Sequence, residues 1–330
     1  METLSDLTGV TRNVLVILIA VFASLAVGTA IRISLLRNAA PEKRAARVGS
    51  LIAWWIMAAI MAIAVLLGKS AGILTFAVIS FMGLREFLRI TGERFREQPL
   101  ELIAFCALPF HYLWILAGWR EAFWMFVPAV VFLLLPVRLI LAGQMKGFIQ
   151  AASAATWGMI LIVYCFSHAA MLLTLPAEEN PAGGPAGWLV YLLILTEMND
   201  ISQALWGRRF GRHKVIPLVS PNKSWEGLIG GMLTTVTLAV ILAPLLTSLA
   251  DVPATSPPGG LRSWLLPGAA GLLIAIGGFF GDLNMSAVKR DLGIKDAGHL
   301  IPGQGGVLDR IDSLTYTGPL FFYFVYFTRH

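Results

Sequence analysis

The sequence predicts an all-α polytopic membrane protein with about ten transmembrane helices and both termini on the non-cytoplasmic side. Of its 330 residues, 57% are hydrophobic and 13% are charged, whereas soluble domains average about 25% charged residues. The apolar residues form blocks of about 20 residues, the length at which a helix crosses a hydrocarbon core roughly 30 Å thick. Membrane β-strands would alternate in polarity, and these blocks do not, so we expect helices.

Ten apolar blocks are candidate spans. The third is short and the sixth is long, so we expect one of these two to be tilted or broken. The first follows an acidic, polar start and is long, which favours a span over a cleaved signal. The expected spans cover residues 13–35, 51–67, 71–84, 101–118, 121–141, 149–175, 187–206, 228–249, 264–284 and 313–328.

The spans belong to one membrane domain with two parts. Residues 1–175 hold about six spans joined by short loops, and residues 176–330 hold the other spans and most of the unusual polar residues. Cys106 and Cys165 lie inside predicted spans and give no reason to expect a disulfide or a metal site. The basic segment at residues 83–99, GLREFLRITGERFREQP, is expected to be a surface helix that contacts solvent or lipid headgroups.

The basic residues divide unevenly between the two sides of the membrane. With loops alternating between sides, twenty of the twenty-five Lys and Arg residues fall on one side. The positive-inside rule makes that side cytoplasmic. The formal charge of +6 therefore reflects topology, and we expect no nucleic-acid partner. The five on the other side are Arg12, Lys69, Arg120, Arg262 and Arg329.

The end of the seventh span carries two acids. Glu197 and Asp200 are three residues apart and share one helix face. Carboxylates in a membrane helix are costly, so this pair indicates a functional site. The arginines that follow, from Arg208 to Arg212, are either topology signals or part of the same site.

The segment VSPNKSWEGLIGG, residues 219–231, precedes the eighth span. Ser220 and Pro221 favour a turn. Lys223 supplies a cation beside the start of a glycine-rich helix, where backbone N–H groups favour an anion such as phosphate. The alternative is a capping box, with Lys223 or Ser224 before the helix and Glu226 in its first turn.

Further acids stand at the ends of the ninth and tenth spans. Asp282 follows GGFFG, residues 277–281, whose glycines let another backbone or a ligand approach closely. Lys289 lies about two turns further along the same helix. Asp309 and Asp312 are three residues apart and share one face of the tenth helix.

Topology gathers the four aspartates, Asp200, Asp282, Asp309 and Asp312, at the cytoplasmic ends of three helices. They would repel one another unless cations intervene, and oxygen ligands suit Mg²⁺, which takes one or two carboxylates plus substrate phosphates. Metal, cations and a glycine-rich loop together indicate phosphoryl or nucleotidyl transfer. The surrounding cations suited to phosphate are Lys223, Lys289, Arg290, Lys295 and Arg310.

Residues 286–312, SAVKRDLGIKDAGHLIPGQGGVLDRID, closely resemble the C-terminal signature of the phosphatidate cytidylyltransferases, also called CDP-diglyceride synthases. The segments GRRFGRHKVIPLVSPNKSWEG and GDLNMSAVKR also resemble this family, so the likeness covers about residues 187–320. There are two departures. Gln304 replaces the histidine of the family's PGHGG, and NDISQA around Asp200 replaces ADTGAY.

The resemblance implies a multi-pass enzyme that joins CTP and phosphatidic acid to give CDP-diacylglycerol and pyrophosphate for phospholipid synthesis, with Mg²⁺ as cofactor. It places the protein among membrane lipids in the bacterial inner membrane, with its active site facing the cytoplasm, and leaves a homodimer open. The expected catalytic residues are Lys223, Asp282, Lys289, Arg290, Asp309 and Arg310. The expected substrate-binding residues are Ser220, Asn222, Lys223, Glu226, Lys295, Gln304, Gly305 and Gly306. The expected metal ligands are Asp200, Asp282, Asp309 and Asp312.

Other functions remain alternatives at this point. The same chemistry could act on another membrane lipid, or a CTP-dependent lipid kinase could share the core. A non-catalytic scaffold is a third reading, to which Gln304 lends weight if the family histidine carries a proton; if that histidine only hydrogen-bonds a phosphate, the Gln304 amide can replace it as donor. A transporter is disfavoured because the acids lie at helix ends rather than at the midplane.

Overall fold

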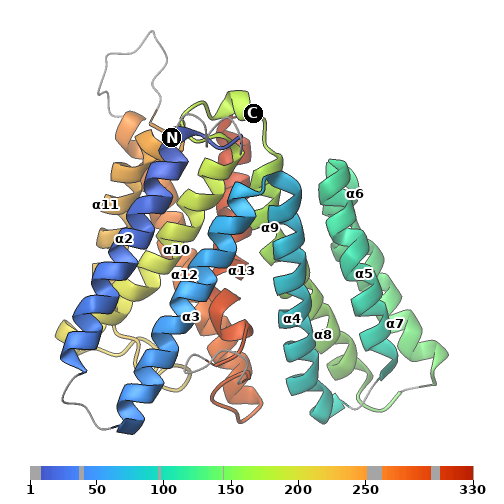
Figure 1. Cartoon of the computed structure of the whole chain (residues 1–330). Helices are drawn as coiled ribbons and strands as arrows, with labels where there is room; N and C mark the ends of the chain where they lie inside the picture. Colours follow the sequence, from blue (N-terminus) through green and yellow to red (C-terminus); the bar gives the residue numbers. More distant parts are fainter. Residues whose placement is uncertain are drawn as a thin grey trace.

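The protein is a bundle of long helices, as the sequence predicts. A computed structural model describes residues 9–36, 41–95, 98–143, 145–250, 262–298 and 305–329. Within these ranges there is no strand, only an isolated bridge between Lys214 and Ser224. Figure 1 shows the chain passing repeatedly between the two ends of the bundle, with both termini at one end.

The described helices make ten passes. Two of the passes contain a π-helical segment: η1 (Phe126–Val131) joins α6 to α7, and η2 (Met159–Cys165) joins α8 to α9. Short 3-10 turns, η3 (Leu172–Thr174) and η4 (Ala177–Glu179), precede α10. The helices are α2 (Arg12–Leu35), α3 (Pro41–Leu66), α4 (Lys69–Phe95), α5 (Gln98–Ala117), α6 (Arg120–Met125), α7 (Phe132–Leu141), α8 (Phe148–Gly158), α9 (Phe166–Met171), α10 (Gly184–Phe210), α11 (Trp225–Leu246), α12 (Arg262–Asp291) and α13 (Leu308–Arg329).

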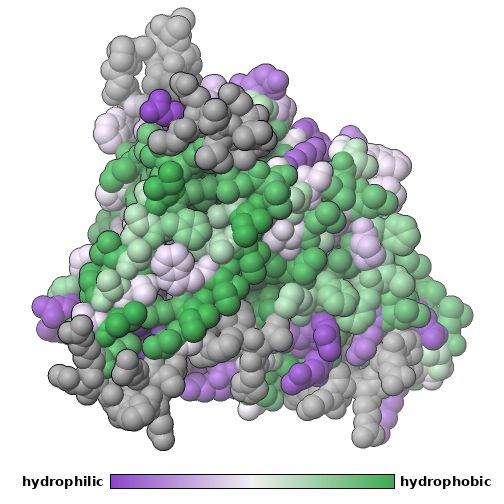
Figure 2. All heavy atoms as spheres, in the orientation of Figure 1, coloured by the Kyte–Doolittle hydropathy of each residue, from purple (hydrophilic) through white to green (hydrophobic). Residues whose placement is uncertain are grey.

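Eight of these passes are long and apolar enough to cross a membrane. The other two, α10 and α13, have 27 and 22 residues and carry Glu197, Asp200, Asp309 and Asp312, which lower their hydropathy. Figure 2 shows hydrophobic side chains across the middle of one face and hydrophilic ones toward its two ends. The protein is therefore an integral, all-α, polytopic membrane protein.

Two expected spans differ from the observed helices in an informative way. The sixth span contains the π-helical segment η2 but remains one continuous span, Phe148–Thr174, so the expected break is not seen there. The third span, expected at residues 71–84, is too short, because α4 continues to Phe95. Charged residues from Arg85 onward lower the hydropathy without ending the helix, so part of the expected surface helix is the end of this span.

The five basic residues assigned to the non-cytoplasmic side all lie at the end of the bundle that carries the termini. Four of them begin a helix and the fifth ends one: Arg12 begins α2, Lys69 begins α4, Arg120 begins α6, Arg262 begins α12 and Arg329 ends α13. The helix directions thus agree with the alternation of loops from which the topology was predicted.

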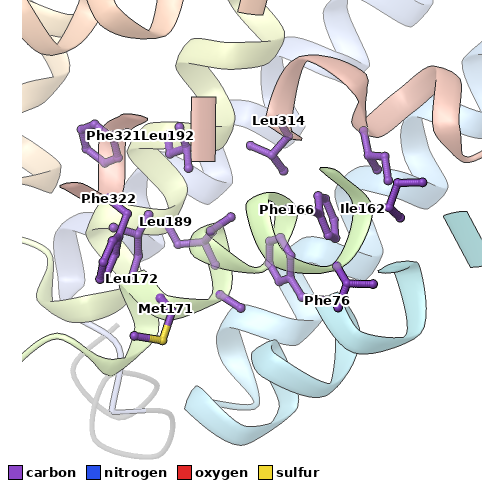
Figure 3. Packing of buried hydrophobic residues seen from close by; sticks show 14 of the residues in the cluster. Phe76, Ile162, Phe166, Met171, Leu172, Leu189, Leu192, Leu314, Phe321 and Phe322 are labelled. Atoms are coloured by element: carbon purple, nitrogen blue, oxygen red, sulfur yellow. The ribbon is translucent and has the colours of Figure 1, made fainter. Parts of the chain in front are cut away.

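Helices α10, α12 and α13 pack against one another, α11 packs on α10 and α12, and α9 packs on α10 and α13. Figure 3 shows Leu189 and Leu192 of α10 beside Phe321 and Phe322 of α13, with Met171 of α9 next to them. All five side chains are buried. Between membrane helices, close van der Waals packing of this kind supplies much of the attraction.

Glycines bring these helices close together near the end opposite the termini. A β-carbon at Gly227 of α11 would lie 2.9 Å from the backbone oxygen of Gln203 in α10. A β-carbon at Gly281 of α12 would lie 2.5 Å from the backbone oxygen of Asp312 in α13. The sequence predicts that the glycines before Asp282 allow either another backbone or a ligand to come close, and at Gly281 it is the backbone of α13 that does so.

We predict that Gly281→Ala destabilises the protein by about 1–3 kcal/mol, the usual cost of overpacking a close interface. The added methyl group would push α13 away from α12. Thermal unfolding of the purified protein in detergent measures the effect. Gly268→Ala is the control on the same helix, because a β-carbon at Gly268 meets no atom within 4 Å. Equal unfolding temperatures for the two variants would contradict the prediction.

Candidate active site at the ends of α10, α12 and α13

Three of the predicted acids converge from three helices. Asp200 of α10, Asp282 of α12 and Asp312 of α13 interact electrostatically, and each repels the others. The hydroxyl of Ser313 donates to Asp200 Oδ2 at 2.8 Å and to the backbone oxygen of Gly278 at 3.3 Å. One serine thus joins all three helices beside the carboxylates.

Lys223 is the cation that faces this group. Its Nζ lies 2.9 Å from Asp282 Oδ2 and 4.5 Å from the centre of the Phe279 ring. The side chain of Lys223 is only 14% exposed. The aromatic face and the carboxylate hold the ammonium group in place next to the acids.

Hydrogen bonds of Ser224 and Glu226 hold the loop before α11 in place. None of them uses the side chain of Lys223, which instead contacts Asp282. The Ser224 hydroxyl accepts a hydrogen bond from the Gly227 N–H at 3.2 Å and caps α11. Glu226 accepts from the N–H groups of Arg212 and His213 and lies 2.6 Å from His213 Nδ1. The interpretation that Ser224 caps the helix is confirmed, although Glu226 contacts the preceding loop instead of completing a capping box. Lys223 as a phosphate-binding cation stays a prediction.

Asp309 is engaged differently from the other aspartates. Its Oδ1 accepts from Lys289 Nζ at 2.6 Å, and its Oδ2 accepts from the N–H groups of Ala297 and Gly306, each at 3.0 Å. Gly305 has a positive φ of 84°, and a β-carbon there would lie 2.5 Å from Asp309 Oδ2. In this structure Asp309 and Lys289 hold the two sides of the last loop against α12.

Glu86 of α4 is a site residue that the sequence analysis missed. Its Oε2 accepts a hydrogen bond from the N–H of Leu308, the first residue of α13, at 2.9 Å. Glycines at 298 and 306 leave room for this carboxylate, since a β-carbon at either would collide with it. The expectation of a solvated surface helix was wrong here. Extending the third span through the apolar residues after Arg85 would have placed an acid inside a span, which is a signal of function.

The remaining predicted residues are spread around this centre. Arg290 donates from Nε to the backbone oxygen of Val219 at 3.3 Å and so ties the end of α12 to the loop before α11. Lys295 and Asn222 are exposed. Gln304 lies outside the described residues.

Two cavities meet at Asp200. The smaller, of about 200 Å³, lies between the loop before α11 and the ends of α10 and α12. Its lining includes Ser220, Asn222, Lys223 and Asp282. The larger, of about 950 Å³, lies on the other side of α10. Its polar lining is Arg32, Arg47, Glu197, Asp200, Arg208, Asp309, Arg310 and Asp312.

The acids suit a divalent cation whose remaining ligands come from a substrate. Over the described ranges no three carboxylate, His or Cys side chains form a ready-made metal site. Lys223 neutralises Asp282, while no described Lys or Arg forms an ion pair with Asp200 or Asp312. Mg²⁺ commonly uses one or two carboxylates and takes its other ligands from substrate phosphates and water. The donor set fits such an ion, with Asp200, Asp282 and Asp312 better placed than the engaged Asp309.

Comparison with known proteins gives a consistent result. A sequence model of the cytidylyltransferase family matches residues 49–328. An uncharacterized protein of Escherichia coli, YnbB, is 44% identical over 286 residues, which are 86% of this chain and 89% of that protein. The phosphatidate cytidylyltransferase of Haemophilus influenzae is 43% identical over 141 residues, 42% of this chain and 46% of the enzyme. That of Brucella melitensis is 34% identical over 215 residues, 63% of this chain and 73% of the enzyme.

We predict that Glu86→Ala loosens the start of α13. The Leu308 N–H would lose its acceptor, which costs about 1–3 kcal/mol for a buried donor. Hydrogen exchange of the peptide that contains Leu308 should become faster, and Glu86→Gln, which keeps an acceptor oxygen, should be milder. Glu101→Ala in the first turn of α5 is the control. Unchanged exchange in Glu86→Ala would remove the glutamate from this role.

Proposed function

Because this chain belongs to the cytidylyltransferase family, we propose that it transfers a cytidylyl group from CTP to phosphatidic acid, giving CDP-diacylglycerol and pyrophosphate. The observation that carries the proposal is the convergence of Asp200, Asp282 and Asp312 beside Lys223 at one end of the membrane helices. The phosphatidate cytidylyltransferases among the relatives support this choice of lipid.

The proposed reaction is an in-line displacement at phosphorus. A phosphate oxygen of phosphatidic acid attacks the α-phosphorus of CTP and forms the new P–O bond. The bond from the α-phosphorus to the oxygen that bridges to the β-phosphorus breaks, and pyrophosphate leaves with the electron pair. The attacking phosphate is already an anion, so no strong general base is needed, and the protein's task is to position and neutralise.

The residues divide this task between them. Lys223, at the wall of the smaller cavity, would neutralise the triphosphate. Asp200, Asp282 and Asp312 would hold Mg²⁺, which when bound offsets negative charge on the phosphates. Asp309 and Lys289 position the last loop and the first turn of α13. Arg310 is the cation beside the acids in the larger cavity.

The location follows from the same proposal. The bulk of the basic residues lie at the end of the bundle that carries the site, and the positive-inside rule assigns that end to the cytoplasm. CTP would then reach the site from the aqueous side of a bacterial inner membrane, and the lipid would reach it from the bilayer.

We predict that the purified protein releases pyrophosphate when given CTP, Mg²⁺ and phosphatidic acid. A parallel measurement of CDP separates this reaction from a CTP-dependent lipid kinase. Gln304→His is run beside the wild type, and activities within a few-fold would show that an amide donor suffices at this position. A folded protein that releases neither product with any lipid phosphate would contradict the proposed function.

We predict that Asp282→Asn lowers kcat by about 10²-fold or more, as expected when a charge that stabilises the transition state is lost. The variant keeps the size of the side chain, so its unfolding temperature should change little. Glu178→Gln, an exposed acid of η4 near the opposite end, is the control for loss of one negative charge. Unchanged turnover in Asp282→Asn would exclude Asp282 from the site.

A further inference from the structure

α2, the first helix of the described residues, lines the larger cavity although the family match begins only at residue 49. α2 contributes Gly28, Ile31, Arg32 and Leu35, all from its last two turns. The start of α3 adds Arg47. Helix α10 forms the opposite wall, and α13 closes the inner end with its acids and Arg310.

The contacts of α2 explain why a cavity remains beside its end. Its buried side chains within the helix, Val14, Leu15 and Ile17, all lie in the first two turns. There Asn13 donates to the backbone oxygen of Ala182 at 3.1 Å. Further along, the helix contacts α3, where Trp55 Nε1 donates to Thr29 Oγ1 at 3.1 Å. α2 is thus attached near its start and to α3, while its last two turns line the cavity whose opposite wall is α10.

The lining of this cavity is apolar on its walls and mixed in charge at the level of the site, where four arginines stand beside four carboxylates. The apolar part consists of Ile31, Leu35, Trp54, Ile201 and Leu205. Within the described part of the chain, Arg32 and Arg47 form no ion pair. Arg310 attracts Glu197, yet its buried Nε has no hydrogen-bond partner there. Arg32 and Arg47 are exposed at the edge of the apolar walls, and guanidinium groups in such a place suit an anion with an apolar body.

Such an occupant is an anionic phospholipid rather than a soluble phosphate. A volume of about 950 Å³ is in the range of ligand pockets, and it accommodates a phosphate headgroup with the first part of its acyl chains. Inorganic phosphate would use the arginines but leave the apolar walls uncovered. Under the proposed function, the triphosphate of CTP would use the smaller cavity on the other side of Asp200, which Lys223 lines.

We infer that α2 and the start of α3 form the lipid-acceptor cleft of this protein, with Arg32 and Arg47 binding the phosphate of the lipid. This inference rests on the proposed function and adds a wall and two recognition residues to it. The phosphate lies between the two arginines and Asp200, at the point where the lipid cleft adjoins the nucleotide cavity.

The first test separates the two substrates by charge. Arg32→Gln should raise KM for phosphatidic acid about tenfold or more, the effect of one hydrogen bond to a charged group, and leave KM for CTP unchanged. Arg32→Lys should restore part of the affinity. Arg138→Gln is the matched control, since Arg138 also lies in the last turn of a helix at this end but does not line the cleft.

The second test fills the cleft without changing charge. A β-carbon at Gly28 meets no atom within 4 Å, so Gly28→Leu adds a side chain to the cleft without a clash at its β-carbon. It should weaken binding of phosphatidic acid, measured by native mass spectrometry in detergent without CTP. Gly268→Leu, also in open space but on α12, is the control. Diacylglycerol and inorganic phosphate are the comparison ligands, and we expect both to bind at least tenfold more weakly than phosphatidic acid.

The outcomes keep the two proposals apart. Protein that binds phosphatidic acid through Gly28 and Arg32 but makes no CDP-diacylglycerol would overturn the proposed reaction and retain the cleft. If the protein is active, and neither Arg32→Gln nor Gly28→Leu changes lipid binding or the KM for phosphatidic acid, the inference of a lipid cleft is wrong. Equal binding of inorganic phosphate and phosphatidic acid would also overturn it, because the apolar walls would then contribute nothing.

Discussion

The close contact of α12 with α13 at Gly281 is the constraint on which the site depends. Because α12 has no side chain there, the backbone of Asp312 lies against it, and Ser313 reaches both Gly278 and Asp200. The contact sets carboxylates from three helices beside one another. Such a group is unfavourable in itself, since its members repel. The bundle tolerates it because two lysines stand next to the acids and the cavities admit water and ligands.

The two lysine–aspartate pairs, Lys289 with Asp309 and Lys223 with Asp282, differ in how fully the carboxylate is engaged. Asp309 has one oxygen on Lys289 and the other on two backbone N–H groups, and its side chain is 7% exposed. Removing either partner would leave a buried charge uncompensated. Asp282 is 34% exposed and its only described cationic partner is Lys223, which also lines the smaller cavity. The first pair therefore supports the loop, and the second can exchange partners when a phosphate or a cation binds.

The ten passes and the convergence of Asp200, Asp282 and Asp312 could be predicted from the sequence. Both follow from hydropathy and from the alternating direction of successive helices. It failed where contacts join distant segments. The hydrogen bond from Leu308 to Glu86 spans 222 positions and uses a backbone donor, which no pattern encodes. The engagement of Asp309 likewise depends on N–H groups of a loop. The proposed part of α2 in lipid binding depends on which of its turns pack against other helices and which line a cavity. The pattern of apolar residues in the sequence does not show this.

The arrangement of the two cavities addresses a problem that any reaction between a lipid and a nucleotide must solve. The two substrates come from different solvents, and their phosphates must nevertheless meet within bonding distance. Asp200 lines both cavities, one bounded by the loop before α11 and the other by α2 and α3. Under the proposed reaction, each substrate keeps the surroundings that solvate its larger part, the acyl chains between apolar helices and the nucleotide beside a polar loop. Only the reacting phosphates have to be desolvated, at the carboxylates and cations that converge there.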